Sequence, residues 1–536
     1  MNRINNCIKY GVLTVAMMLL NACNLDINMD PNNPSAVSTA QLLTNAQLDI
    51  VNSIGSGSPG LSNPAGVFVH QVTQRSTNDQ YAITGQDFAG TQAWANLYRA
   101  IQNLNVLSDQ ATANQQFSYA GVAQIMKALA FSYMVDVWGD VPFTEASTAA
   151  KIQFPKFDKG QDIYPQLFTL IDEGIANLAK ASALSPRTDD LIYAGNLVRW
   201  RQFAKSLKLK LYNQIRLVQN VSAPVNALIA EDDLMKAGGN FSLSYGTSSA
   251  PDNRHPAFRE DYNITTTGRD NYISPYFHEI LLGTSTLNPI LTGIQDPRIP
   301  YYYFNQLSAA RPNAQNAVEY RNGNFVSIYF SSQGPNQGFD QSSSIAIIGL
   351  YYCGGRFDDG NGVSAAGVSG ASARGDGPQR ILPYHSHLFT RAELAQSGVS
   401  TGNAKQLFSD AINAAFAEVN AAAARGGAPA ITAAAIKEYV DAVLVKYDAA
   451  SESGKLELIM TEKWISNFGF ALESYNDIRR TGFPKIYDPN TDGIAFTNVN
   501  RGYPQSYPYP TPGELQLNPN APAQRVVAND KVFWQK

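Results

Sequence analysis

The sequence predicts a mostly α-helical fold in which a long irregular lobe interrupts a helical scaffold. Apolar residues recur every three to four positions in several segments of two blocks, about 41–220 and 386–480. The stretch of about 240–385 is instead rich in Gly, Ser, Asn, Tyr and Phe and shows little helical periodicity. The chain after Thr481 is irregular and proline-rich, so we expect residues 481–536 to wrap around the scaffold as a tail.

Each expected helix carries an apolar stripe of its own. The stripes predict helices at 41–53, 92–108, 122–137, 163–178, 200–215, 411–425, 436–447 and 455–471. Asp162 is placed to cap the helix that follows it. Gly139 is expected to end a helix, and Pro142 is expected to keep the chain extended after it.

The amino terminus has the features of a bacterial lipoprotein signal. Arg3 and Lys9 precede an apolar run that is too short to be a stable membrane anchor, and small residues then lead to Cys23. We therefore expect residues 1–22 to be a signal peptide and Cys23 to carry the acyl chains, because lasting attachment requires more than one chain. Residues 23–40 are polar and contain prolines, which predicts a flexible tether. Residues 41–536 are expected to form a single domain.

Composition excludes several classes of protein. The net charge is −4 and only 16% of the residues are charged, which argues against a nucleic-acid partner. With Cys23 acylated, Cys353 has no disulfide partner and a cysteine metal site is excluded. After residue 23, the sequence contains no apolar run that is long enough to span a membrane.

The search for catalytic and cofactor motifs finds none of the common nucleophile, phosphate-loop, dinucleotide or zinc-protease patterns, so we expect no cofactor. His385 and His387 are interpreted as polar residues at a loop-to-helix junction rather than metal ligands. Asp488, Asn490 and Asp492 are spaced like the first half of a calcium loop, but Val499 replaces the expected Glu, which favours a turn. A glycoside hydrolase would need two paired carboxylates; the candidates are Asp136, Asp140, Glu145, Glu462, Glu473 and Asp477.

Aromatic residues in irregular segments are the remaining candidates for binding. Exposed rings stack on the apolar faces of sugars, while Asn, Asp, Arg and Gln bond the hydroxyl groups. The alternative is that most of these rings pack the lobe. The rings that we select for binding are those of Tyr81, Trp94, Tyr272, Tyr276, Tyr301 and Tyr352.

Several strings, in order along the chain, resemble the SusD/RagB family of outer-membrane nutrient-binding lipoproteins, in the branch that ends Arg-Arg-Thr-Gly-x-Pro. The matching strings are Asp136–Ala146, Asp190–Gly195, Trp200–Lys210, Asp296–Arg298, Glu462–Ile465, Glu473–Pro484 and the Tyr507-Pro508 element with Glu514 and Asn518. The residue types in most of these strings can be explained by folding alone. Arg479 and Arg480, for example, follow an acidic helix, which suggests buried ion pairs.

The resemblance implies helix pairs of the tetratricopeptide type, with the ligand site in the irregular lobe. It also implies a non-enzymatic protein that faces the cell exterior and hands oligosaccharides to a SusC-like TonB-dependent outer-membrane transporter. The polar residues Arg75, Asn78 and Asp79, with Tyr81 and Trp94, occupy the region where better-known members contact their ligands.

Three alternatives stay open at this point. A peptide-capturing protein of the same architecture would lack an exposed aromatic platform. A surface hydrolase would need two close carboxylates with shifted acidities in a cleft. An adhesin or structural protein would be favoured if the Gly-rich loop 353–380 were its only exposed binding element.

Overall fold

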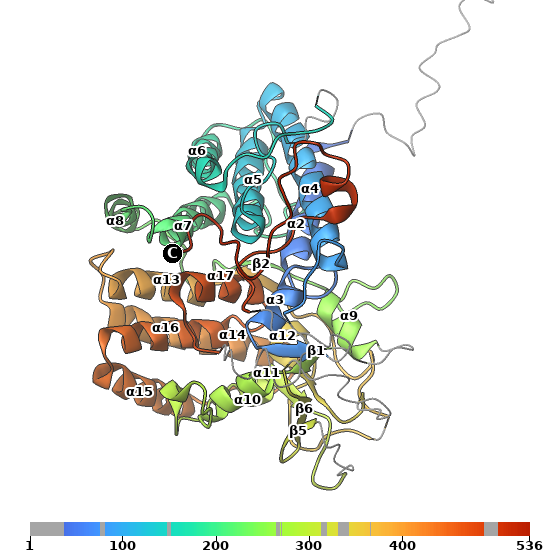
Figure 1. Cartoon of the computed structure of the whole chain (residues 1–536), viewed down its shortest axis with the longest axis vertical. Coiled ribbons are helices and arrows are strands. Elements are labelled where there is room, and N and C mark those ends of the chain that lie inside the picture. The colour runs from blue at the N-terminus through green and yellow to red at the C-terminus, as the bar shows by residue number, and fades with distance from the viewer. Residues whose placement is uncertain are drawn as a thin grey trace, which may run out of the picture.

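The computed structural model describes residues 37–74, 81–146, 152–263, 269, 271–311, 319–330, 342–364, 366–486 and 502–536. Two blocks of helices lie beside an irregular lobe (Figure 1). The first block contains α2 (Thr39–Ile54), α3 (Ser62–Phe68), α4 (Phe88–Ala113), α5 (Phe117–Trp138), α6 (Gly160–Leu178), α7 (Leu197–Ile215) and α8 (Ser222–Ala230). Neighbours in this block pack in sequence order, α4 on α5 and α5 on α6, and α2 lies along α4.

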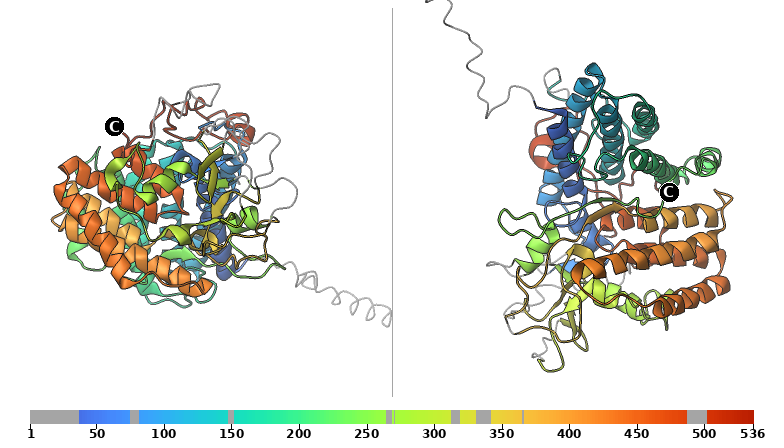
Figure 2. Two further views of the ribbon diagram at one scale, coloured as in Figure 1. Left: turned by 90° about the horizontal axis from the view of Figure 1, so that it is seen from below. Right: turned by 180° about the vertical axis from the view of Figure 1, so that it is seen from behind.

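The second block lies below the first in Figure 1 and forms a stack when seen from behind in Figure 2. It contains α13 (Tyr384–Gln396), α14 (Ala404–Gly426), α15 (Ala433–Ala449), α16 (Glu452–Ser466) and α17 (Ala471–Thr481). α13 packs on both α14 and α16, and α17 packs against α3 of the first block. The predicted helical scaffold is confirmed in both blocks.

The lobe between the blocks is built from short pieces. Its helices are α9 (Pro256–Tyr262), α10 (Pro275–Leu282), η2 (Pro289–Leu291), α11 (Ile299–Tyr302) and α12 (Leu350–Cys353). The strands are β1 (Val72–Gln74), β2 (Phe241–Leu243), β3 (Asn271–Ile273), β4 (Tyr303–Asn305), β5 (Glu319–Asn322), β6 (Phe325–Ile328), β7 (Ala346–Ile348) and β8 (Gln379–Leu382). They form the antiparallel pairs β1–β3, β2–β8, β4–β7 and β5–β6. The pair β1–β3 matters most for function, because it ties the first helical block to the lobe.

The helix boundaries agree with the sequence analysis at one expected position and differ from it at two. Gly139 ends α5 with φ +83°, as its position before Pro142 predicts. The single helix expected over 455–471 is wrong: α16 ends at Ser466, and Gly469, with φ +98°, lies in the turn before α17. The expected Asp162 cap is wrong as well. α6 begins after Lys159, and the carboxylate of Asp140 accepts from the Gly160 N–H at 3.0 Å.

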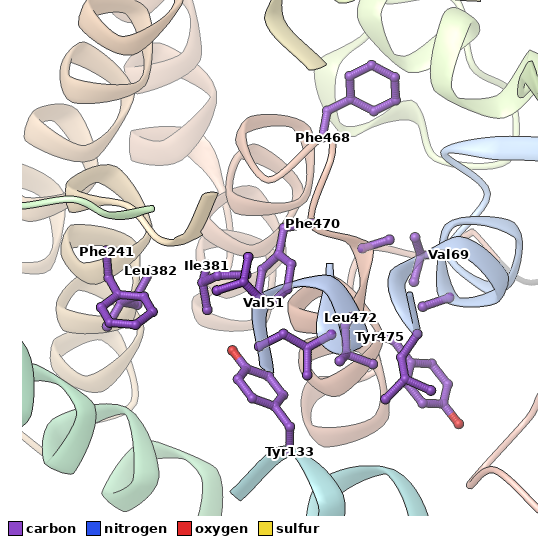
Figure 3. Packing of buried hydrophobic residues seen from close by; sticks show 14 of the residues in the cluster. Val51, Val69, Tyr133, Phe241, Ile381, Leu382, Phe468, Phe470, Leu472 and Tyr475 are labelled. Carbon is purple, nitrogen blue, oxygen red and sulfur yellow. The ribbon is translucent and has the colours of Figure 1, made fainter. Parts of the chain in front are cut away.

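The hydrophobic core runs through both helical blocks. Figure 3 shows Leu472 and Tyr475 of α17 beside Val51 and Val69 of the first block. Tyr133 of α5 approaches the same group from the opposite side, and its ring contacts that of Phe470. α17 is therefore the element around which the two blocks are joined.

The carboxyl-terminal tail lies against α5 and contains the short turn η3 (Thr511–Leu515). The Tyr507 N–H donates to the Val137 carbonyl at 2.9 Å, and the Trp138 indole donates to the Pro508 carbonyl at 3.0 Å. Trp534 is fully buried and donates to the Asp136 carboxylate at 2.9 Å. In the described part of the chain, no helix combines the length and apolar character that crossing a membrane requires.

Candidate functional site

A pocket opens between α3, the end of β1 and the start of α4. Its cavity volume is about 160 Å³, which is smaller than that of a typical small-ligand site, so it can enclose only part of a larger ligand. The described residues that line it are Asn63, Pro64, Val67, Phe68, Gln74, Ala82, Ile83, Asp87 and Ala89.

The four lining residues of α3 lie on one side of that helix. Asn63 and Val67 are one helical turn apart, as are Pro64 and Phe68, so all four side chains reach the same wall. Phe68 is buried, and its ring contacts those of Tyr475 and Tyr507 at centroid distances of 5.7 Å. The floor of the pocket is therefore supported by the core.

Gln74 joins the pocket to the lobe. It is the last residue of β1 and pairs with Asn271 of β3 in the ladder. Its side-chain amide also donates to the Asn271 side-chain oxygen at 3.0 Å. A ligand that contacts Gln74 would thus lie where the first helical block meets the lobe.

The start of α4 supplies the remaining polar wall and an exposed ring. Asp87 is the N-cap residue of α4, and its carboxylate accepts a hydrogen bond from the Thr84 N–H. Phe88, between the lining residues Asp87 and Ala89, is 62% exposed. An aromatic ring this exposed beside a pocket can stack on an apolar ligand face.

The tail holds the wall between Ala82 and Asp87 in place. The Thr511 N–H donates to the Gly85 carbonyl at 2.7 Å. A Cβ on Gly85 would lie 2.3 Å from the Tyr509 carbonyl oxygen and 2.6 Å from Gln524 Nε2, so a side chain does not fit there. The Gln524 amide in turn bonds both the N–H and the carbonyl of Tyr509, at 2.8 Å each. The pocket wall and the tail form one packed unit.

The residues selected from the sequence divide into three groups. Arg75, Asn78 and Asp79 lie outside the described residues, as do Cys23, Asp488, Asn490 and Asp492. Four selected rings are buried: Tyr81, Trp94, Tyr272 and Tyr301. Tyr276 and Tyr352 are half-buried and keep part of each ring accessible.

The buried rings have structural partners. Trp94 packs in edge contact with Trp138 at 5.1 Å and against Tyr98 at the same distance. The Tyr81 hydroxyl is 2.8 Å from His70 Nε2. These rings support the site from behind rather than offering a face to a ligand.

The sequence analysis missed Asn63, Asp87 and Phe88. The available signal was weak: Phe88 lies off the apolar stripe that runs through Ala93, Leu97 and Ala100 of α4, which are buried. A large aromatic residue off such a stripe at a helix start is a candidate for an exposed contact.

The candidate carboxylates for hydrolysis are engaged elsewhere. Glu462 pairs with Arg298 at 2.8 Å in the buried interior, and Glu473 pairs with Lys210 at 3.1 Å. Asp477 pairs with both Lys463 and Arg480. Burial is the largest influence on the pKa of Glu473, and it raises that pKa, but Lys210 and Lys463 together outweigh it and hold it below its usual range. The Glu473 and Asp477 pairs form a network between α7, α16 and α17, whereas Glu462 joins α16 to Arg298 of the lobe.

Asp136, Asp140 and Glu145 are likewise bound. The buried Asp136 accepts from Tyr164 and from Trp534, at 2.5 and 2.9 Å. Asp140 pairs with Lys159 at 2.7 Å. The Glu145 carboxylate accepts from the Lys156 N–H at 2.9 Å. The six carboxylates are thus bound in structural contacts, and none of them lines the pocket.

Buried ion pairs account for part of the Arg479-Arg480 motif. Arg480 pairs with Asp477 and Glu393 in the interior. Arg479 instead donates to the carbonyls of Asp136 and Gln505 and lies over the Tyr475 ring at 3.9 Å. The motif joins α17 to the tail and to α5.

The other residues that the sequence analysis considered are buried or paired within the fold. His385 and His387 are buried at the start of α13, and burial lowers the pKa of each to about 3. Cys353 is a free, buried thiol. In the Gly-rich loop 353–380, Arg374 pairs with Asp376 at 2.7 Å. Within the described ranges, no three His, Cys, Asp or Glu side chains gather in a way that could hold a metal ion.

Comparisons with known proteins agree with this architecture. A family model described as "Starch-binding associating with outer membrane" matches residues 31–510. No curated protein matches the sequence. Among solved structures, a SusD/RagB family protein from Bacteroides thetaiotaomicron has a TM-score of 0.67 at 19% identity, over 93% of this chain and 99% of the other.

Two further structures are described by their ligand. A chitin-binding SusD homolog from Flavobacterium johnsoniae has a TM-score of 0.64 at 16% identity, over 92% of this chain and 98% of the other. A chitin-binding protein has a TM-score of 0.67 at 20% identity, over 93% of this chain and all of the other. Likeness at this level of identity establishes the fold, and the predicted fold is confirmed.

Proposed function

Because the chain belongs to the SusD-like family of outer-membrane nutrient-binding proteins, we propose that its pocket captures oligosaccharides for a partner TonB-dependent transporter in the outer membrane. One observation carries the proposal: two amides and a carboxylate line a pocket of about 160 Å³, and the exposed Phe88 lies in the chain between two of the lining residues.

The chemistry of the pocket suits a saccharide. The amides of Asn63 and Gln74 offer both donors and acceptors to hydroxyl groups, and Asp87 offers acceptors. The Phe88 ring can stack on the apolar face of a sugar ring. The family is described as starch-binding and two similar structures as chitin-binding, so both glucose and N-acetylglucosamine oligomers are suitable probes.

The contacts extend in our proposal to the neighbouring segment. Gln74 lines the pocket, and Arg75, Asn78 and Asp79 follow it directly in the chain. The partly accessible rings of Tyr276 and Tyr352 are proposed as secondary contacts in the lobe. The buried Tyr81, Trp94, Tyr272 and Tyr301 are proposed to act by supporting the site.

Attachment and delivery are also part of the proposal. Acyl chains on Cys23, at the end of the short signal segment, would hold the folded body at the membrane, facing the cell exterior. Transfer to a transporter requires release, so a modest affinity is sufficient.

The protein is proposed to bind without catalysis, since the six candidate carboxylates lie in structural contacts away from the pocket. The test uses the chain from residue 24 onward in titration calorimetry with malto- and chito-oligosaccharides, followed by product analysis. We expect saturable binding and unchanged saccharide. Release of shorter products at enzyme-like rates would contradict the proposal, as would binding of peptides but of no saccharide.

A further inference from the structure

We propose that Asp87 makes the pocket select saccharides by charge, in the order amine-bearing, then neutral, then acidic. This inference rests on the proposed saccharide binding and names the class of ligand that the same site prefers. It starts from the composition of the pocket wall. Asp87 is the one ionisable side chain among the described residues that line the pocket.

The remaining lining residues do not compensate its charge. Asn63 and Gln74 are neutral amides, and the other six are apolar. Among the described residues, no Lys, Arg or His side chain forms an ion pair with Asp87. The carboxylate of Asp87 can therefore interact electrostatically with a ligand in the pocket.

The Asp87 carboxylate also keeps room for a ligand. It accepts a hydrogen bond from the Thr84 N–H, and the residue is exposed. A carboxylate offers about four acceptor positions, so several stay open after this bond. An ammonium group on a bound sugar can take one of them as a charge-assisted hydrogen bond.

The start of α4 offsets this charge only in part. The amino-terminal end of a helix acts as a positive charge of roughly one half, which is smaller than the charge of one carboxylate. Among the described residues that line the pocket, Asp87 therefore leaves a net negative charge. With a neutral residue at this position, the positive helix end remains, and the preference should flatten or reverse.

The expected effect is moderate because the site is open to solvent. Two charges about 5 Å apart near a protein surface interact strongly enough to change affinity by about three- to tenfold once water and salt have screened them. We therefore expect an acidic oligosaccharide to bind about three- to tenfold more weakly than a neutral one. An amine-bearing oligosaccharide should bind more tightly than the neutral one by a similar factor.

The test compares three oligosaccharides of equal length: acetylated chito-oligosaccharide, its deacetylated form, and oligogalacturonate. Affinities are measured by calorimetry at low and high salt, at a pH where the amines of the deacetylated form are protonated. The variant is Asp87→Asn. Its matched control is Asp109→Asn, which removes the same charge from an exposed position on the same helix, roughly 33 Å away along the axis.

We expect the charge order in the natural protein and in Asp109→Asn, weakened by salt, and its loss in Asp87→Asn. Oligogalacturonate binding as tightly as the acetylated oligomer would overturn the inference, as would the same order in Asp87→Asn. Either result leaves saccharide binding itself intact. Failure of the natural protein to bind any of the three, or malto-oligosaccharides, would instead contradict the proposed function.

Discussion

The Arg480 guanidinium donates to both carboxylate oxygens of Glu393, with Nη2 at 2.9 Å from Oε1 and 2.8 Å from Oε2, and so links α17 to α13. Arg216 of the α7 terminus reaches the same carboxylate at 2.8 Å. Burial raises the pKa of Glu393, but Arg480 and Arg216 outweigh it and hold that pKa well below its usual range. The carboxylate thus stabilises the fold at neutral pH, and its contribution is lost only as the pH falls below about 4.5 toward the lowered pKa.

Replacing Glu393 by Gln should lower the free energy of unfolding by about 3–5 kcal/mol, because the buried Arg216 loses its counter-charge and the buried Arg480 keeps only that of Asp477. Denaturant-induced unfolding measures this change. The matched control is Asp448→Asn, which breaks the exposed pair with Lys405 and should change stability by less than about 1 kcal/mol. Equal effects of the two substitutions would contradict this account of the network.

The buried histidines predict acid sensitivity. Burial, followed by the nearby charges of Arg391 and Lys236, lowers the pKa of His387 to about 3. In the unfolded chain its pKa is about 6.5. Below that value the unfolded state binds a proton that the folded state does not, so stability is complete above pH 6.5 and falls as the pH decreases toward 3.

Between pH 7 and pH 5, the free energy of unfolding of the natural chain should therefore fall by about 2 kcal/mol more than that of His387→Gln. Urea unfolding at the two pH values gives the difference for the natural chain and for the variant. If the variant loses as much stability as the natural chain, His387 is not the neutral buried group described here.

The contact between tail and pocket wall predicts a difference between two glycines. Gly85→Ala places a Cβ against Tyr509 and Gln524, so it should cost about 1–3 kcal/mol and weaken saccharide binding by displacing the wall. Gly90→Ala, on the neighbouring turn of α4, meets nothing within 4 Å and should leave binding unchanged. Calorimetry and unfolding of both variants compare the effects, and unaltered binding in a folded Gly85→Ala would argue against a role of the tail.

Periodicity predicted most of the scaffold because long helices bury one regular stripe. The stripe from Ile163 to Leu178 marks α6, which buries one face. α5, predicted over 122–137, is instead buried on nearly every side, so its continuous apolar character marks it as much as a stripe does. Periodicity failed at 455–471, where apolar residues continue through a turn. Gly469 lies in that turn with a positive φ, and a lone glycine inside an apolar pattern does not reveal that conformation in advance.

The site was less predictable because exposure is a tertiary property. Trp94 and Phe88 are both aromatic residues of one helix, yet Trp94 is buried and Phe88 is 62% exposed. Helical phase hints at the difference, but only packing decides it. The resemblance pointed to the segment that begins at Arg75, directly after Gln74. The partner of Gln74, Asn271, is distant in sequence and became visible only through the pairing of β1 with β3.

Titration calorimetry on Phe88→Ala tests the central claim most directly. The probe is the oligosaccharide that the natural chain binds most tightly. The control is Phe154→Ala, which removes a ring that is 39% exposed and has no pocket-lining residue beside it in the chain, whereas Phe88 lies between the lining residues Asp87 and Ala89. Loss of the stacking face should weaken binding by about tenfold in Phe88→Ala, with Phe154→Ala unchanged. Equal affinity of Phe88→Ala and the natural chain would contradict the assignment of this pocket as the saccharide site.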